Sequence, residues 1–156
     1  MAIDKVKEYF RQYNMEDKIQ EFKVSSATVE LAAQALGCEP KRIAKSLSFL
    51  VDDQAILIVT AGDAKIDNPK YKAMFSCKAK MLSYEQVEDY IGHAVGGVCP
   101  FGIPDTVTVY LDESLKRFET VFPACGSSNS AIELTISELE KYSNFTDWVD
   151  VCKDWE

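Results

Sequence analysis

Four of the seven glycines of this 156-residue chain lie within eleven residues, in the stretch GHAVGGVCPFG at 92–102. The same stretch holds the only histidine, one of the five cysteines and a proline. Glycine permits backbone conformations that other residues avoid, and it allows a ligand to approach main-chain atoms closely. The stretch therefore predicts a loop, which is either a tight turn or a backbone surface that receives a ligand.

Helices and strands are predicted on both sides of this loop without strict alternation. Helical spacing and capping residues predict helices over 2–13, 27–36, 69–75 and 83–92, a further helix starting with the capping box 137–140, and an amphipathic helix over 145–155. Apolar and β-branched runs predict strands over 46–51, 55–61, 106–111, 119–122 and 131–136, the first two forming a hairpin through 52–54. We expect one mixed α/β domain over 1–156 in which antiparallel pairing dominates.

The composition is that of a globular protein, with 47% hydrophobic and 27% charged residues. Its longest apolar stretches, such as 55–61, are too short to cross a bilayer, and the charged N-terminus is not a secretory signal. The five cysteines are scattered and odd in number, which indicates reduced thiols in a cytoplasmic protein. One histidine and dispersed cysteines offer no ligand pair at zinc spacing, so we expect no metal and no membrane partner.

The net charge of −8 argues against a broad nucleic-acid interface, but the charge is unevenly distributed. Residues 65–80 contain five lysines and one aspartate, a local charge of +4. This basic segment is either a contact for a phosphate backbone or a solvated surface, and its sequence fits both interpretations. The candidate tRNA contacts are Lys65, Lys70, Lys72, Lys78 and Lys80.

Three groups of residues offer chemistry, each with a structural alternative. His93 and Cys99 form a nucleophile pair if they meet in space, although a histidine beside a helix end also binds free carbonyls. The glycine loop offers backbone N–H donors of the kind that make an oxyanion hole. Residues 126–130 form either a hairpin turn or a polar wall, and Lys45, entering an apolar strand, either reaches solvent or meets an anion.

Four motifs follow one another along the chain: AKSL at 44–47, AGDAK at 61–65, GHAVGGVCPFG at 92–102 and CGSSNSAIE at 125–133. In this order they resemble the YbaK/prolyl-tRNA synthetase-associated editing-domain family. The resemblance covers about residues 25–136, and 137–156 would form a helical C-terminal tail. The family's G-x-x-x-P motif is present as Gly96–Pro100.

The resemblance implies a single domain with a mostly antiparallel, barrel-like mixed sheet flanked by helices. It implies a trans-editing deacylase that needs no cofactor and hydrolyses the ester between a wrong amino acid and tRNA. Alanine or cysteine on tRNA(Pro) is the typical substrate, and serine or threonine is the substrate in some branches. The implied partners are the acceptor end of a misacylated tRNA and prolyl-tRNA synthetase. Cys125 and the run 127–129 depart from the alanine- and cysteine-specific branches, so the amino acid and the tRNA stay open.

By the same resemblance, Lys45 is the functional lysine, and Lys45→Ala is expected to abolish deacylation while the chain still folds. The glycine loop faces the aminoacyl ester, and the second loop shapes the amino-acid pocket. The substrate-binding candidates are Gly96, Gly97, Val98, Cys99, Pro100, Gly126, Ser127, Ser128 and Asn129. Two other functions remain open: a hydrolase that uses Cys99 with His93, and a non-catalytic module that binds the aminoacylated end of tRNA.

Overall fold

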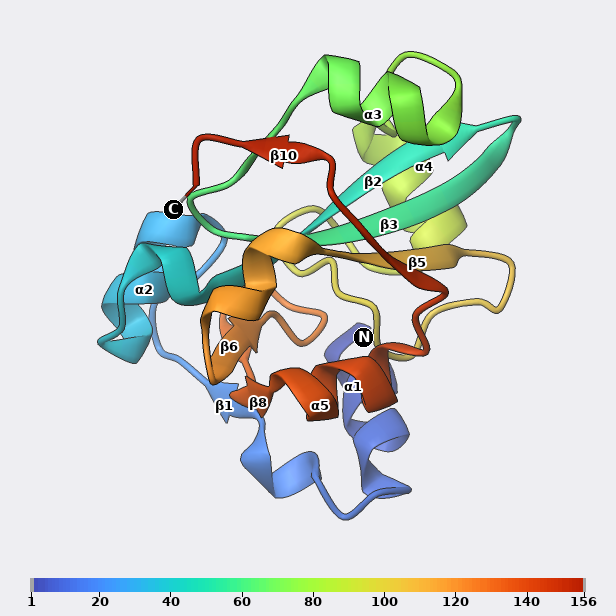
Figure 1. Ribbon diagram of the computed structural model, residues 1–156. Coiled ribbons are helices and arrows are strands. Elements are labelled where there is room, and N and C mark those ends of the chain that lie inside the picture. Colours follow the sequence, from blue (N-terminus) through green and yellow to red (C-terminus); the bar gives the residue numbers. More distant parts are fainter. Residues whose placement is uncertain (1, 156) are drawn as a thin grey trace.

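A six-stranded mixed sheet forms the centre of the fold in the computed structural model, which describes residues 2–155 (Figure 1). The strand order is β8-β6-β2-β3-β5-β9. Its strands are β2 (Ile43–Val51), β3 (Gln54–Ala61), β5 (Thr108–Asp112), β6 (Thr120–Pro123), β8 (Leu134–Thr135) and β9 (Asp147–Val149). Two antiparallel pairs lie outside it: β1 (Gln20–Glu21) with β7 (Ser130–Ala131), and β4 (Lys65–Ile66) with β10 (Cys152–Lys153).

The expected single mixed α/β domain is confirmed, but antiparallel pairing does not dominate the six-stranded sheet, because three of its five strand pairs are parallel. Within residues 2–155, three strand pairs are parallel, namely β2 with β6, β3 with β5, and β5 with β9. The other four are antiparallel, and they include the long ladder between β2 and β3. Five α-helices flank the strands: α1 (Ala2–Arg11), α2 (Val29–Leu36), α3 (Asn68–Phe75), α4 (Tyr84–Ile91) and α5 (Ile136–Ser143). Three short 3₁₀ helices complete the regular structure: η1 (Glu16–Lys18), η2 (Pro40–Arg42) and η3 (Glu113–Arg117).

The hairpin of β2 and β3 lies at the centre of the sheet, and the sequence predicted this hairpin. Eight residue pairs join the strands, from Ala44 opposite Ala61 to Val51 opposite Gln54. Asp52 and Asp53 form the turn, and both have positive φ, 51° and 63°. Two consecutive positive-φ residues match the right-handed twist of the flanking strands, and Asp tolerates that conformation better than most residues.

Helices α2 and α4 begin and end at the predicted residues. The Thr28 side chain accepts a hydrogen bond from the Leu31 N–H at the start of α2, and Gly37 ends the helix with φ 69°. Ser83 and Gln86 form the capping box of α4, and Gly92 ends that helix with φ 87°. Each cap satisfies backbone groups that the helix leaves free, and each fixes where the next loop begins.

The C-terminal predictions were partly wrong. The capping box of α5 is made by Thr135 and Glu138, two residues before the predicted one, and the expected strand over 131–136 is divided between β7 and β8. Residues 145–155 form no helix: α5 ends at Asn144 in the left-handed region, and the chain continues as β9 and β10. Pairing with β5 and β4 outweighs the helical spacing of the apolar residues, because it satisfies backbone groups of the segment and buries Val149 and Cys152.

The first helix anchors the glycine stretch to the core. Val6 and Phe10 of α1 are fully buried, and so is Phe101, which lies within the glycine stretch. The rings of Phe10 and Phe101 pack with their centroids 4.7 Å apart. Burial of two aromatic rings contributes a few kcal/mol, so the far end of the glycine stretch is held firmly.

Candidate functional site

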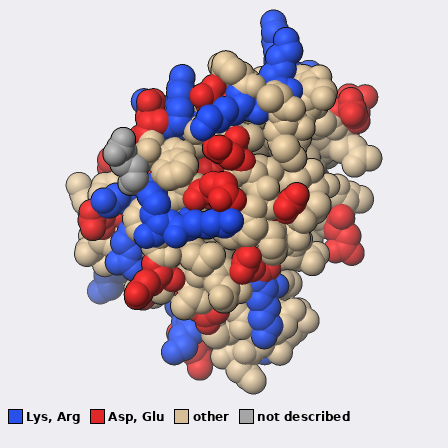
Figure 2. Space-filling model, in the orientation of Figure 1, with Lys and Arg blue, Asp and Glu red and all other residues tan. Residues whose placement is uncertain are grey.

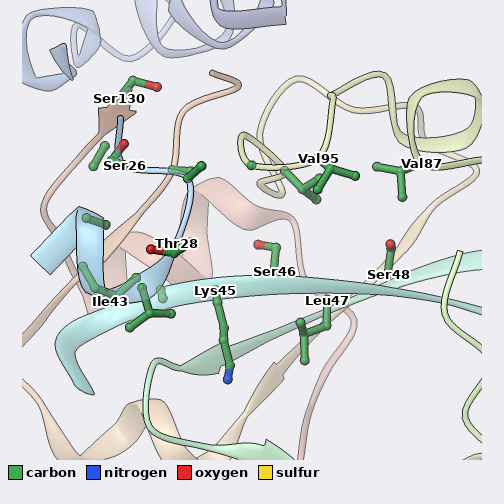
Figure 3. A pocket seen from close by; sticks show the side chains of 18 of the residues that line it. Ser26, Thr28, Ile43, Lys45, Ser46, Leu47, Ser48, Val87, Val95 and Ser130 are labelled. Carbon is green, nitrogen blue, oxygen red and sulfur yellow. The ribbon is translucent and has the colours of Figure 1, made fainter. Parts of the chain in front are cut away.

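A cavity of about 460 Å³ opens between β2, the start of α2, the start of α4 and the glycine loop. Figure 3 shows these elements converging around the side chains of Ser46, Ser48, Val87 and Val95. The wall is mostly apolar, and among residues 2–155 only Lys45 and Tyr84 contribute a titratable side chain to it. Neither a carboxylate nor an imidazole nor a thiol of the described residues lines it, so any chemistry here depends on backbone groups, hydroxyls and the ligand.

The cavity side of β2 carries two hydroxyl groups. Ser46 and Ser48 occupy alternate positions of the strand, and Figure 3 shows both side chains pointing toward the space below Val95 and Val87. The Ser46 Oγ is buried and has no hydrogen-bond partner within the described chain. Alternation along a strand puts residues i and i+2 on one face, which explains why the two hydroxyls lie together.

Lys45 extends from β2 on the side opposite Ser46 and Ser48, although the residue itself borders the cavity (Figure 3). Burial lowers the pKa of its ammonium below the ordinary lysine value, while nearby Cys152 and Asp63 act in the opposite direction. Asp63 is already engaged, because it accepts hydrogen bonds from Arg117 Nη1 at 3.0 Å and Nη2 at 2.6 Å. Over residues 2–155, no hydrogen bond or ion pair reaches the Lys45 ammonium, so it is a half-buried positive charge without a partner.

The glycine loop closes the cavity with its backbone. Gly96 and Val98 border the cavity, and neither of their N–H groups donates to any residue in the part of the chain described. The Gly97 N–H donates to the Ala94 carbonyl, and the Gly97 carbonyl accepts from Gly126 N–H at 3.0 Å. A Cβ on Gly97 would lie 2.6 Å from backbone atoms of Gly126 and Ser127, so the two loops touch only because this residue has no side chain.

The second loop, 126–129, braces the first one, and its polar groups are used internally. The Ser128 carbonyl accepts from Ser26 N–H at 2.6 Å, and Asn129 Nδ2 donates to the Phe22 carbonyl at 2.9 Å. The Ser127 hydroxyl donates to Ser130 Oγ at 2.7 Å. Of the predicted wall residues at 126–129 none borders the cavity, whereas their neighbours Ser130 and Ala131 do.

The comparison with protein families agrees with the order of the motifs. A family model for the aminoacyl-tRNA editing domain matches residues 24–142. The chain belongs to this family. The resemblance that its four motifs carry is thereby confirmed, and the matched range contains every element around the cavity.

Relatives of this editing domain occur both as separate chains and inside a larger enzyme. YwhH of Bacillus subtilis (strain 168), described as an uncharacterized protein, is 58% identical over 157 residues and is covered completely, as is this chain. A proline–tRNA ligase of Geobacillus sp. (strain WCH70) is 26% identical over 125 residues, which are 80% of this chain and 22% of the ligase. A crystal structure described as a candidate trans-editing enzyme for prolyl-tRNA synthetase superposes with a TM-score of 0.87 and 27% identity, over 97% of both chains.

His93 and Cys99 do meet in the editing domain, but away from the cavity. His93 Nε2 donates to the Phe101 carbonyl at 2.9 Å and lies 3.5 Å from Cys99 Sγ, and both residues are fully buried. Burial lowers the pKa of His93 and raises the pKa of Cys99 to about 12. A nucleophilic cysteine needs a lowered pKa and access to substrate, so this arrangement fits a role in holding the loop. Pro100 also lies outside the cavity and borders a separate depression beside α5.

The five lysines predicted to contact tRNA lie on exposed or partly exposed positions. Lys70 donates to Asp150 Oδ1 at 3.1 Å and to the Cys152 carbonyl at 2.9 Å, which ties α3 to the C-terminal segment. Figure 2 shows acidic and basic side chains interspersed over the face viewed there. Lys80 directly precedes Met81, which borders the cavity, and Lys78 comes two residues before Lys80; both lysines are exposed.

Sequence reasoning missed the residues that form the floor and the rim of the cavity. Ser46 and Ser48 carried a usable signal, since two serines at alternate positions of an apolar strand share one face. The rim residues Met81, Tyr84 and Val95 are 59%, 78% and 45% exposed, and no sequence pattern distinguishes them from core residues.

None of the helices between residues 2 and 155 is long and apolar enough to span a membrane, and that range contains no cluster of three metal-ligating side chains.

Proposed function

We propose that this chain is an aminoacyl-tRNA deacylase that hydrolyses the ester of a misacylated tRNA in trans. The observation that carries the proposal is the cavity wall formed by Gly96 and Val98, whose free backbone N–H groups suit an ester carbonyl, in a chain of the aminoacyl-tRNA editing family. The similarity to proline–tRNA ligases and to the candidate trans-editing enzyme supports tRNA(Pro) as the tRNA. A small wrong amino acid, such as alanine or cysteine, is what the resemblance to the editing-domain family implies. The partners of the chain are then the tRNA acceptor end and prolyl-tRNA synthetase, in the cytoplasm.

The reaction needs positioning more than a strong base, because an aminoacyl ester is already activated. Water adds to the ester carbonyl carbon, and the oxygen that becomes negative is stabilised by backbone donors of the glycine loop. The bond between the carbonyl carbon and the ribose oxygen then breaks, the ribose oxygen takes a proton and becomes the free hydroxyl, and the free amino acid leaves. The described residues of the cavity wall include no carboxylate, imidazole or thiol, and Lys45 extends to the other side of β2, so the added water loses its proton to solvent or to a group of the substrate.

The rim of the cavity suits the terminal adenosine of tRNA. Tyr84 is 78% exposed at the first position of α4 and borders the cavity together with Met81. An exposed aromatic ring next to a binding site is a platform on which a base stacks, with a contribution of about 1–3 kcal/mol. Lys78 and Lys80, just before this rim, then approach the phosphates of the acceptor end.

The proposed ligand of Lys45 is the phosphate or the ribose of the terminal adenosine of tRNA. Its ammonium extends away from Ser46 to the other side of β2, so its direction does not favour the ester carbonyl above β2. A half-buried ammonium without an acidic partner gains most from an anion that arrives with the substrate. Lys45 therefore contributes to binding and orientation of the acceptor end.

The two alternative functions predict different results in one assay. A purified sample is incubated with tRNA(Pro) charged with alanine, serine, cysteine or threonine, and release of the amino acid is followed against buffer alone. The proposal predicts accelerated release of at least one of them. Release at the buffer rate for all four, together with saturable tRNA binding, would support the binding module and contradict a deacylase.

A thiol-dependent hydrolase is separated from the proposal by alkylation of the cysteines. Cys99 is fully buried and its pKa is raised to about 12, so deacylation by a backbone site is expected to survive a thiol reagent that leaves the fold intact. Loss of all activity on modification of Cys99 alone would favour the Cys99–His93 hydrolase.

A further inference from the structure

An ion pair between Arg117 and Asp63 lies close to the ammonium of Lys45. Arg117, the last residue of η3, donates to both carboxylate oxygens of Asp63, from Nη1 at 3.0 Å and from Nη2 at 2.6 Å. Asp63 comes three residues after Thr60, which is the partner of Lys45 in the β2–β3 ladder. Although burial acts to raise it, the pKa of Asp63 is lowered by Arg117, so the carboxylate is charged. Two parallel hydrogen bonds fix its orientation as well.

Arg117 is itself held in one orientation by its other contacts. Its Nε donates to the Ser114 carbonyl at 2.9 Å. Its guanidinium carbon lies 5.0 Å from the ring centroid of Trp155 and 4.7 Å from that of Phe118. The Arg117 side chain is 15% exposed, compared with 30% for Asp63. A planar guanidinium that is stacked on aromatic rings and anchored at Nε is preorganised, so Arg117 sets the position of the carboxylate.

Lys45 is left with no anion of its own. Among residues 2–155 no side chain makes an ion pair with its ammonium. Besides burial, the groups that act on its pKa are Cys152, Asp63, Lys65 and Glu30. Burial raises the pKa of the Cys152 thiol, which is therefore uncharged, Lys65 is a cation, and Glu30 is exposed to solvent, which weakens its attraction. Of these four groups, Asp63 is thus the partly buried carboxylate that could neutralise Lys45.

We propose that Arg117 is a positioning residue, which binds Asp63 and thereby keeps the Lys45 ammonium available for a phosphate of the tRNA acceptor end. This inference rests on the proposed function, in which Lys45 binds the terminal nucleotide. A carboxylate and a phosphate compete for one ammonium, and a carboxylate of the same chain has the advantage of proximity. With both oxygens bound and its charge balanced by Arg117, Asp63 no longer competes.

The test first removes Arg117 and then removes the carboxylate that this releases. Arg117→Met keeps an apolar stem against the two rings, and KM for charged tRNA should rise about threefold to tenfold with little change in kcat. Adding Asp63→Asn to Arg117→Met should return KM to within about twofold of wild type, because no carboxylate is left to capture Lys45. Damage to the fold predicts the opposite, since the double variant has lost both partners of the ion pair.

Arg11→Met is the matched control. Arg11 also pairs with carboxylates, those of Glu8 and Glu16, but it lies on α1 and does not border the cavity. Its substitution should leave KM unchanged. All variants are compared below the unfolding midpoint of the least stable one.

The protonation of Lys45 gives a second measurement, which needs no substrate. Its pKa is followed by NMR titration of the lysine side-chain carbon signals, and Lys45→Met assigns the signal. The pKa should rise in Arg117→Met, because a released carboxylate stabilises the ammonium, and it should fall again when Asp63→Asn is added. A pKa that stays raised in the double variant would mean that loss of Arg117 hydrates Lys45, and it would overturn the inference.

The possible outcomes separate this inference from the function on which it rests. If wild-type protein releases none of the four amino acids faster than buffer, the proposed function fails, and the titration alone decides whether Arg117 keeps Asp63 from Lys45. If release is accelerated but Arg117→Met changes neither KM nor the pKa of Lys45, only the inference fails. The same holds if KM in the double variant stays as high as in Arg117→Met.

Discussion

The two faces of β2 differ in the chemistry that they present. Ser46 and Ser48 face the cavity with neutral hydroxyls and share it with the glycine loop, whereas Lys45 extends to the other side, toward Asp63 and Cys152. Lys45 and Ser46, which are neighbours in the AKSL motif, thus belong to two different surfaces. The cavity face suits a small uncharged amino-acid side chain, and the opposite side suits an anion. This separation of tasks follows from the alternation of a strand and is what the following variants test.

Closing the cavity face is expected to have the largest effect. Gly97→Val places a Cβ 2.6 Å from the backbone of Gly126 and Ser127, so the loop must move away from the cavity. Displacement of catalytic donors by about 1 Å costs about 100-fold in rate, and kcat/KM for deacylation should fall by at least this factor. Gly37→Ala is the control, since its Cβ meets nothing within 4 Å.

Gly37 has φ 69°, so its replacement should lower the unfolding midpoint slightly while leaving the activity unchanged. Equal loss of activity in both glycine variants would mean that general destabilisation, and not the loop, controls the reaction.

Removing the charge on the opposite face is expected to have the next largest effect. Lys45→Met keeps the aliphatic stem and loses the ammonium, so KM for charged tRNA should rise by about tenfold or more with little change in kcat. The salt dependence of tRNA binding should weaken by about one phosphate contact. A fall in kcat with KM unchanged would instead assign Lys45 to the ester carbonyl and remove the distinction between the two faces.

A smaller effect is expected at the rim of the cavity face. Tyr84→Ala removes the proposed stacking platform and should raise KM by about tenfold with little change in kcat. Tyr90→Ala is the matched control, because Tyr90 is an exposed tyrosine of the same helix that does not border the cavity. Equal effects of both substitutions would argue that the helix surface, and not a base-stacking contact, matters.

Much of the fold followed from local sequence patterns. The β2–β3 hairpin, the caps of α2 and α4 and the glycine loop are each determined by residues close together in the chain, such as Asp52, Ser83 and Gly92. The C-terminal segment was not predictable in the same way. Its apolar residues have helical spacing, but strands β9 and β10 form because β5 and β4, which are distant in sequence, offer edges to pair with.

The candidate site, too, was predictable only where its residues follow from local sequence patterns. The motifs identified the glycine loop and Lys45, and the contact between Gly97 and the loop at 126–127 brings two of the motifs together. Alternation along β2 also contained the information that Lys45 and Ser46 point to opposite sides. The exposure of Tyr84 could not be predicted, because it depends on how α4 packs against the sheet.

Substitution of the buried thiol should have a smaller effect than any change on either face of β2. Cys99→Ala leaves the backbone of the glycine loop intact and removes a thiol whose pKa of about 12 keeps it protonated. We expect kcat/KM to change by less than about threefold, with a modest loss of stability from the small cavity created. Activity that disappears in this variant while the protein remains folded would transfer the catalytic role to Cys99 and His93.

The smallest expected effect is on the pH dependence of stability. It reports on Lys45 alone, on the side of β2 opposite the cavity. Burial lowers the pKa of Lys45 below its ordinary value of 10.5, so between the two pKa values the unfolded chain binds more protons than the folded one. Stability contributed through Lys45 therefore rises as the pH rises through this window, and the cost of the buried charge is fully present below it. Denaturant unfolding of wild type and Lys45→Met should show the variant more stable at pH 7, with the difference narrowing toward pH 10. A difference that stays constant over this range would mean that the Lys45 ammonium is not desolvated, and the anion proposed to satisfy it would lose its physical basis.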